Sequence, residues 1–123
     1  MIALSIVAPG GTRIARGQKT LEVRSWRPPA LPLRDLLIVE NALYLSDERP
    51  EDPAGRAVAL VDVVAVHAWR EDEVAEACSS GWRPGYHAWV LQNVRALTPH
   101  SGVPAQRGLY EIDPAILTDP GEG

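Results

Sequence analysis

Apolar residues along this chain group into short runs divided by turn-forming residues, a pattern typical of a protein built mainly from strands. Ala3–Ala8 and Leu36–Glu40 are apolar runs that predict two short buried strands. Ala57–His67 is apolar on both faces, which favours a central strand in a closed or well-covered sheet. His87–Leu97 and Arg107–Ile112 predict two further strands.

The segment Thr20–Trp26 alternates regularly, and this alternation predicts another strand with two different faces. The face expected to point into the core carries Leu21, Val23 and Ser25. The opposite face carries Thr20, Glu22, Arg24 and Trp26. A carboxylate, a guanidinium and an indole therefore follow one another along a single row.

Two short helices are predicted between the strands. Thr12 is placed to cap the first helix, which we expect to run to about Arg16. Gly17 is placed to end that helix in a left-handed conformation. Arg70–Cys78 predicts the second helix, because acidic residues occupy its first turn, where the helix dipole favours them.

Prolines and glycines predict the remaining connections. Pro28–Pro32 predicts an extended linker, Ser46–Gly55 a polar loop and Pro99–Pro104 a turn region. Five or six strands with two short helices indicate a small mixed barrel. We expect residues 1–113 to form this one domain and residues 114–123 to form a frayed tail.

Composition excludes several classes of protein. A chain of 123 residues has the length of a single domain. Cys78 is the only cysteine, so no intrachain disulfide forms, and the three histidines lack ligand-like spacing, so no metal site and no cofactor are predicted. The longest apolar run is short and is interrupted by Asp62, and the first residues lack a signal-peptide pattern. We therefore expect a cytoplasmic protein without a membrane span.

Charge is distributed unevenly along the chain. Residues 1–34 contain six basic groups and one acid, whereas residues 35–123 contain six basic groups and fifteen acids, which gives a net charge of −4. This asymmetry favours an anionic partner for the basic third. An acidic chain is poorly suited to a long duplex, so a nucleotide, a short single strand or a small anion fits better. The alternative is that the acidic remainder folds over the basic segment and pairs with it.

Lys19 is the only lysine among twelve basic residues. Unlike arginine, a lysine amine can hold or release a proton near neutral pH when its surroundings shift its pKa. Strict alternation places Lys19 and Glu22 on opposite faces of the strand. The two side chains meet only if Lys19 lies in the preceding loop or if a bulge intervenes. The structural alternative to a ligand site is an ion network that seals the mouth of the barrel.

The segment Gly17–Trp26 reads G-x-K-T-x-E-x-R-S-W and resembles the signature of ASCH domains, the activating-signal-cointegrator homology domains. The resemblance continues in order over nearly the whole chain. Its further matches are Ser5-Ile6 with Pro9, Leu36–Val39, Val58–Val64, Gly85–Asn93, Pro104 and Arg107–Tyr110.

This resemblance implies an α+β fold like that of PUA domains, a mixed β pseudo-barrel with helices at the rim. It implies a cleft beside the K-T-x-E-x-R strand that binds RNA or a nucleobase. Some family members hydrolyse a modified nucleoside and others cut RNA. The chain departs from the amidohydrolase branch, which carries a threonine nucleophile where Glu22 stands, and Tyr110 replaces the closing tryptophan of the family.

Candidate site residues come from the strand and from the ends of its neighbours. If the protein is an enzyme, Lys19 and Glu22 are its candidate catalytic pair through proton transfer. The candidate ligand-binding residues are Ser5, Thr20, Arg24, Trp26, Asn41 and Tyr86. Arg24 offers a bidentate fork for phosphate or a base edge, and Trp26 offers a surface on which a base can stack.

Three functions remain open at this point. The first is an RNA- or nucleotide-binding ASCH domain protein. The second is a small hydrolase of a modified nucleoside, or a ribonuclease, that uses Lys19 and Glu22. The third is a protein-interaction adaptor whose acidic two-thirds meets a basic partner. The sequence does not determine an oligomeric state.

Overall fold

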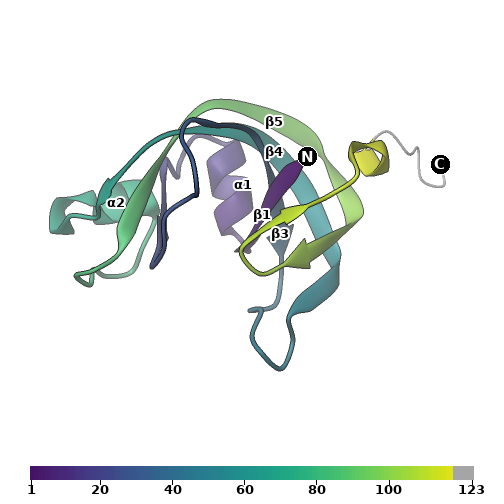
Figure 1. The fold of residues 1–123 in the computed structure, drawn as a ribbon, viewed down its shortest axis with the longest axis horizontal. Coiled ribbons are helices and arrows are strands. Elements are labelled where there is room, and N and C mark those ends of the chain that lie inside the picture. Colours follow the sequence, from purple (N-terminus) through teal and green to yellow (C-terminus); the bar gives the residue numbers. More distant parts are fainter. Residues whose placement is uncertain (118–123) are drawn as a thin grey trace.

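Two long antiparallel strands, β4 (Glu51–Ala68) and β5 (His87–Gln106), form the centre of the sheet. The computed structural model describes residues 1–117. The two strands rise together as an arch that spans most of the molecule (Figure 1). The apolar run Ala57–His67 lies within β4, and β4 has a neighbouring strand on each side, so the prediction of a central strand is confirmed.

Four shorter strands complete a six-stranded sheet in the order β2-β5-β4-β3-β1-β6. They are β1 (Ile2–Val7), β2 (Leu21–Arg24), β3 (Leu33–Asn41) and β6 (Leu109–Glu111). β1 is parallel to β3, and every other pairing is antiparallel. β2 and β6 are the edge strands, so the mixed sheet curves without closing into a full barrel.

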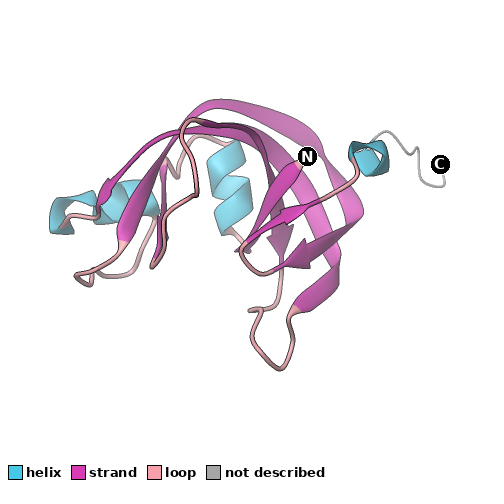
Figure 2. Ribbon diagram, viewed as in Figure 1, coloured by secondary structure: helices cyan, strands magenta, loops and turns pink. Residues whose placement is uncertain are grey.

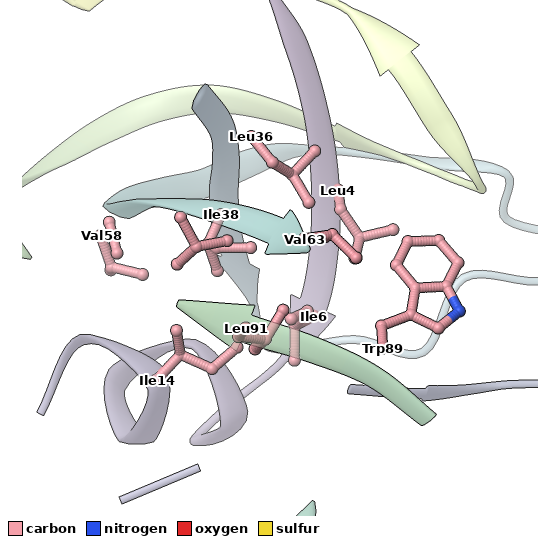
Figure 3. Packing of buried hydrophobic residues seen from close by; sticks show 11 residues of the cluster. Leu4, Ile6, Ile14, Leu36, Ile38, Val58, Val63, Trp89 and Leu91 are labelled. Carbon is pink, nitrogen blue, oxygen red and sulfur yellow. The ribbon is translucent and has the colours of Figure 1, made fainter. Parts of the chain in front are cut away.

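The curvature of the sheet comes from several register shifts between β4 and β5, including one between Leu60 and Asp62. Bulges of this kind bend a strand and increase its twist. The helix α1 (Gly10–Ala15) lies under the resulting arch (Figure 2). Its Ile14 packs into a cluster with Leu4, Ile38 and Trp89, shown in Figure 3. A strongly curved sheet can therefore enclose a core with only one short helix on its concave side.

Two segments that were predicted to be connections between strands lie partly or wholly in strands. β4 begins at Glu51, inside the loop predicted for Ser46–Gly55. The turn predicted for Pro99–Pro104 lies within β5, which continues to Gln106. β2 pairs only with residues His87–Val90, so the later half of β5 has a strand partner on one side alone. Proline is tolerated there because its missing N–H can face the unpaired edge.

The helical regions differ from the prediction in detail. Pro9, not Thr12, occupies the N-cap of α1, whereas Gly17 has the expected left-handed φ of 76°. The second helical region divides into a 3-10 turn, η1 (Glu71–Glu73), and the α-helix α2 (Val74–Ala77). The first part of the predicted tail contains another 3-10 turn, η2 (Pro114–Leu117), and residues 118–123 lie outside the described residues.

One side chain of the alternating segment departs from its predicted place. β2 ends at Arg24, so Ser25 is exposed instead of pointing into the core. Leu21 is buried, and Val23 packs beside it against residues of α2 and β5, as predicted. Trp26 is half-buried, with its ring centroid 4.9 Å from that of Trp89 in an edge-to-face arrangement. In residues 1–117 no helix is long and apolar enough to cross a membrane.

Candidate ligand-binding site

Lys19 lies in the loop between α1 and β2 and reaches Glu22 from there. The backbone N–H groups of Gln18 and Lys19 both donate to the carbonyl of Arg13, which folds this loop back on the helix. The Lys19 residue is only 8% exposed. Its Nζ donates to the carbonyl of Ala77 at 2.7 Å and lies 3.3 Å from Oε1 of Glu22. The loop position, one of the two geometries that permit the contact, is thus the one observed.

Glu22 connects this amine to a guanidinium. Oε2 of Glu22 accepts a hydrogen bond from Nε of Arg24 at 2.6 Å, and Nη2 of Arg24 donates to the carbonyl of Ser5 at 2.9 Å. The carboxylate is therefore bound by one cation at each oxygen. The chain of contacts joins the C-terminal end of α2, at Ala77, to strand β1 across the middle of β2. The ion network of the structural alternative exists, and it forms the wall of a cavity.

A cavity of about 790 Å³ lies beside this network and is called here the basic cavity. β1, α1, β2, the segment after β3 and the β5–β6 turn all contribute to its wall. Its charged lining residues are Arg13, Lys19, Glu22, Arg24 and Arg107. Four cations and one carboxylate give this cavity a positive balance. Its volume lies within the range of roughly 300–1,000 Å³ that is usual for small-molecule sites.

Asn41 contributes a polar group to the basic cavity that has an unused acceptor. This residue is 3% exposed, and its Nδ2 donates to the carbonyl of Leu43. Its Oδ1 is buried and has no hydrogen-bond partner among residues 1–117. A buried acceptor without a partner carries an energetic cost.

The second cavity, of about 510 Å³, is called here the aromatic cavity. Its aromatic lining residues are Trp69, Trp82 and Tyr86. Lys19, Glu22 and Val23 line both cavities. The other residues that line the aromatic cavity do not line the basic cavity. The Lys19–Glu22 ion pair is therefore the place where the two cavities meet.

The structure brings most of the predicted site residues together. The basic cavity is lined by Lys19, Glu22, Ser5, Arg24, Trp26 and Asn41, whereas Tyr86 lines the aromatic cavity. Thr20 lines neither cavity; it is exposed, and its backbone N–H donates to the carbonyl of Glu76. The hydroxyl of Ser5 already donates to the carbonyl of Gln106 at 2.8 Å.

Among the lining residues of the basic cavity that sequence reasoning missed are Arg13, Tyr44 and Arg107. Arg13 belongs to the basic excess of the first third, which was the one signal that could have found it. Tyr44 follows β3 and is 82% exposed. Arg107 lies in the β5–β6 turn, where it pairs with Asp47. The last two come from segments distant in sequence. No local pattern marks Tyr44, whereas Arg107 begins the Arg107–Tyr110 match to the family pattern.

The acidic remainder of the chain does not neutralise the basic third. Of the six basic side chains in residues 1–34, only Arg34 pairs with an acid among residues 35–117, namely Asp62. Within residues 1–117, ion-pair partners are absent for Arg13, Arg16 and Arg27. The charge asymmetry of the sequence is thus retained around the basic cavity.

Glu40 holds α1, and with it Arg13, against the sheet. Its carboxylate accepts hydrogen bonds from the backbone N–H of Thr12 at 2.7 Å, from the hydroxyl of Thr12 at 2.9 Å and from Nη2 of Arg56 at 2.9 Å. Burial by itself would raise the pKa of Glu40, but these hydrogen bonds and the charge of Arg56 outweigh it and hold the pKa below its ordinary value.

Asp62 interrupts the apolar run of β4. Its side chain makes contacts with neighbouring segments of the sheet and lines neither cavity. It accepts hydrogen bonds from the backbone N–H of Asp35 and the side-chain amide of Asn93, and it pairs with Arg95 and Arg34. The two hydrogen bonds are the main reason that the pKa of Asp62 lies below its ordinary value. These contacts give Asp62 a structural role, because they join β4 to the segments that carry Arg34 and Arg95. No group of three or more potential metal-ligating side chains occurs in the described part of the chain.

A curved mixed sheet, short helices at its rim and a cavity beside the short strand β2 define a PUA-like α+β pseudo-barrel. The ASCH domain family model matches residues 4–101, and the chain belongs to this family. The sequence resemblance is thereby confirmed.

Solved structures support the same fold. ASCH from Zymomonas mobilis is 15% identical in sequence to this chain. The structural match covers 95% of this chain and 90% of the Zymomonas mobilis chain, with a TM-score of 0.55. A point variant of that protein is 12% identical, with coverages of 98% and 96% and a TM-score of 0.55. At this identity the likeness establishes the fold alone. No curated protein matches the chain.

Proposed function

We propose that this protein binds RNA or a nucleotide in the basic cavity, through Lys19, Glu22, Arg24 and Trp26. The observation that carries this proposal is the set of four cations around one carboxylate at a cavity of about 790 Å³. Membership of the ASCH family supports it, because the resemblance implies a nucleic-acid cleft at this strand.

Each proposed contact follows from the donors that the network leaves unused. The ammonium of Lys19 has three N–H groups; one donates to Ala77, and the charge also pairs with Glu22 at 3.3 Å, so at least one N–H remains for a ligand. Arg24 uses Nε and Nη2, so Nη1 remains to donate to a phosphate oxygen. Trp26, with its edge contact to Trp89, offers ring surface for stacking a base.

Two neighbouring arginines allow a sharp test of this function. Arg13 and Arg16 are both exposed and both lack an ion-pair partner in residues 1–117, but only Arg13 lines the basic cavity. The measurement is the affinity of a short single-stranded RNA at several salt concentrations. Arg13→Ala is expected to weaken binding and to reduce the salt slope by about one.

Arg16→Ala is the matched control and is expected to change both quantities much less, because the charge it removes lies outside the cavity. Equal effects of the two variants would place the RNA elsewhere on the basic surface. Absence of RNA and nucleotide binding at low salt, with the fold intact, would contradict the proposal.

A second candidate function is hydrolysis of a modified nucleoside or cleavage of RNA. The contact of 3.3 Å between the Lys19 amine and the Glu22 carboxylate favours it, because an adjacent amine and acid at a cavity wall can transfer a proton. Lys19→Arg separates the candidates when turnover and binding are both measured. A binding protein keeps its affinity because the charge remains, whereas an enzyme loses nearly all its rate. An adaptor for a basic protein would be indifferent to changes at either residue.

A further inference from the structure

The aromatic cavity is built to hold a flat ring. Nε1 of Trp82 donates to the carbonyl of Trp69 at 3.0 Å, and Nε1 of Trp69 donates to the carbonyl of Glu73 at 3.2 Å. The two indole centroids are 6.5 Å apart with an interplanar angle of 50°. Trp69 is buried, whereas Trp82 is only half-buried. Because these bonds fix the indoles before any ligand arrives, stacking on Trp82 requires little ordering of the protein.

Polar groups at the same cavity remain without partners. Arg83 is exposed and forms no ion pair with any residue in the described chain, 1–117. The hydroxyl groups of Ser80 and Tyr86 likewise make no hydrogen bond to residues in this range. The charged lining residues are Lys19, Glu22 and Arg83, a balance of one positive charge. Aromatic surface, free hydroxyls and positive charge together fit a nucleotide better than an uncharged apolar molecule.

The position of the Lys19–Glu22 pair relates this cavity to the basic one. Both cavities are lined by Lys19, Glu22 and Val23, and their other lining residues differ. The remaining N–H of Lys19 is therefore at the boundary, where a phosphate that links two nucleotides would pass.

We infer that the protein takes two consecutive nucleotides of a single strand, one in the basic cavity and the next on Trp82 in the aromatic cavity. This inference rests on the proposed function and names its ligand class: a single-stranded oligonucleotide of at least two nucleotides. Stacking on an indole tolerates any base, so the subsite adds affinity without selecting a base.

The test compares two ligands of similar charge, adenosine 5′-diphosphate and the dinucleotide pApA, by calorimetric titration at low salt. The wild-type protein is expected to bind pApA more tightly by about 5- to 150-fold, the range for one additional stacked base. Trp82→Ala is expected to reduce the affinity for pApA to that for adenosine 5′-diphosphate.

A second variant avoids the risk that Trp82→Ala disturbs the packing around α2. Ser80 is exposed and lies at the cavity wall, so Ser80→Trp fills the aromatic cavity from outside the core. This variant is also expected to abolish the preference for the dinucleotide. Ala75→Trp is the matched control, because Ala75 is exposed on neighbouring α2 and lines neither cavity. It is expected to retain the preference.

The outcomes separate the inference from the proposed function. Equal wild-type affinities for the two ligands would overturn the second subsite and leave nucleotide binding in place. If Ser80→Trp lowered the affinity for both ligands equally, the bound nucleotide would occupy the aromatic cavity alone, and the inference would be wrong. Failure of both ligands to bind the folded wild-type protein would overturn the proposed function together with the inference.

Discussion

Nζ of Lys19 lies 3.3 Å from Oε1 of Glu22, although strict alternation would place these two side chains on opposite faces of a strand. The contact is possible because β2 begins at Leu21, so Lys19 belongs to the loop before it. A loop residue is free of the strand period, and its amine can turn towards the carboxylate. Glu22 thus joins the loop residue Lys19 to the strand residue Arg24 at the wall of both cavities.

Removing the Glu22 carboxylate should destabilise the protein. Glu22→Ala leaves the Lys19 ammonium and the Arg24 guanidinium without their shared anion, and breaking a largely buried pair costs on the order of 3 kcal/mol. Urea unfolding measures the change in the free energy of unfolding. Glu76→Ala is the control, because Glu76 is exposed and its side chain has no ion-pair partner within residues 1–117. A similar loss in both variants would show that the network contributes little.

Stability should fall in acid as Glu40 is protonated. The pKa of Glu40 in the folded protein is below its ordinary value of 4.5, because hydrogen bonds from Thr12 and Arg56 outweigh the effect of burial. The carboxylate therefore adds stability that is present above about pH 4.5 and is lost as the pH falls through the folded pKa. Thermal unfolding from pH 7 to pH 3 measures this dependence.

The variant Glu40→Gln should show a weaker acid dependence, with the remaining part due to groups such as Asp62, whose pKa is also lowered. Glu48→Gln provides the comparison, because Glu48 is exposed and has no ion-pair partner in the described chain. An unchanged pH profile in Glu40→Gln would contradict the assigned role.

Tyr110 should ionise only in strong alkali. Burial raises the pKa of Tyr110 from 10.0 to about 12. The neutral phenol therefore contributes stability that is complete below pH 10 and is lost as the pH rises towards 12, about 2–3 kcal/mol in all. Ultraviolet absorbance of tyrosinate follows the titration, and Tyr110→Phe should remove the most alkaline step. Titration of all three tyrosines near pH 10 in the folded protein would contradict the burial argument.

Two glycine substitutions should differ sharply. A Cβ at Gly55 would lie 2.5 Å from the carbonyl oxygen of Val103 and 2.7 Å from Cγ1 of Val39. Because backbone must move to relieve the first contact, Gly55→Ala should lower the free energy of unfolding by about 1–3 kcal/mol. Gly81→Ala is the control, since nothing lies within 4 Å of its Cβ position. Urea unfolding compares the two variants, and equal stabilities would show that β4 adjusts freely at Gly55.

The strands and the family could be predicted from the sequence because their signals are local. A buried strand needs a run of apolar residues, and such runs correctly indicated β1, β3 and the middle of β4. Gly17 at the end of α1 is equally local, since a positive φ favours glycine. The G-x-K-T-x-E-x-R-S-W segment indicated the ASCH family for the same reason, because its residues are contiguous.

Only the tertiary structure decided how strand ends and cavity walls are formed. Pro99 and Pro104 lie within β5 because no second strand needs their missing N–H groups, and that depends on which strand lies beside them. Arg107 reaches the basic cavity because pairing of β6 with β1 brings the last turn beside Ser5. The sequence alone indicated the apolar strand segments, namely β1, β3 and the middle of β4. Long-range pairing and packing determine which side chains share a cavity, because those contacts join residues that no local pattern relates.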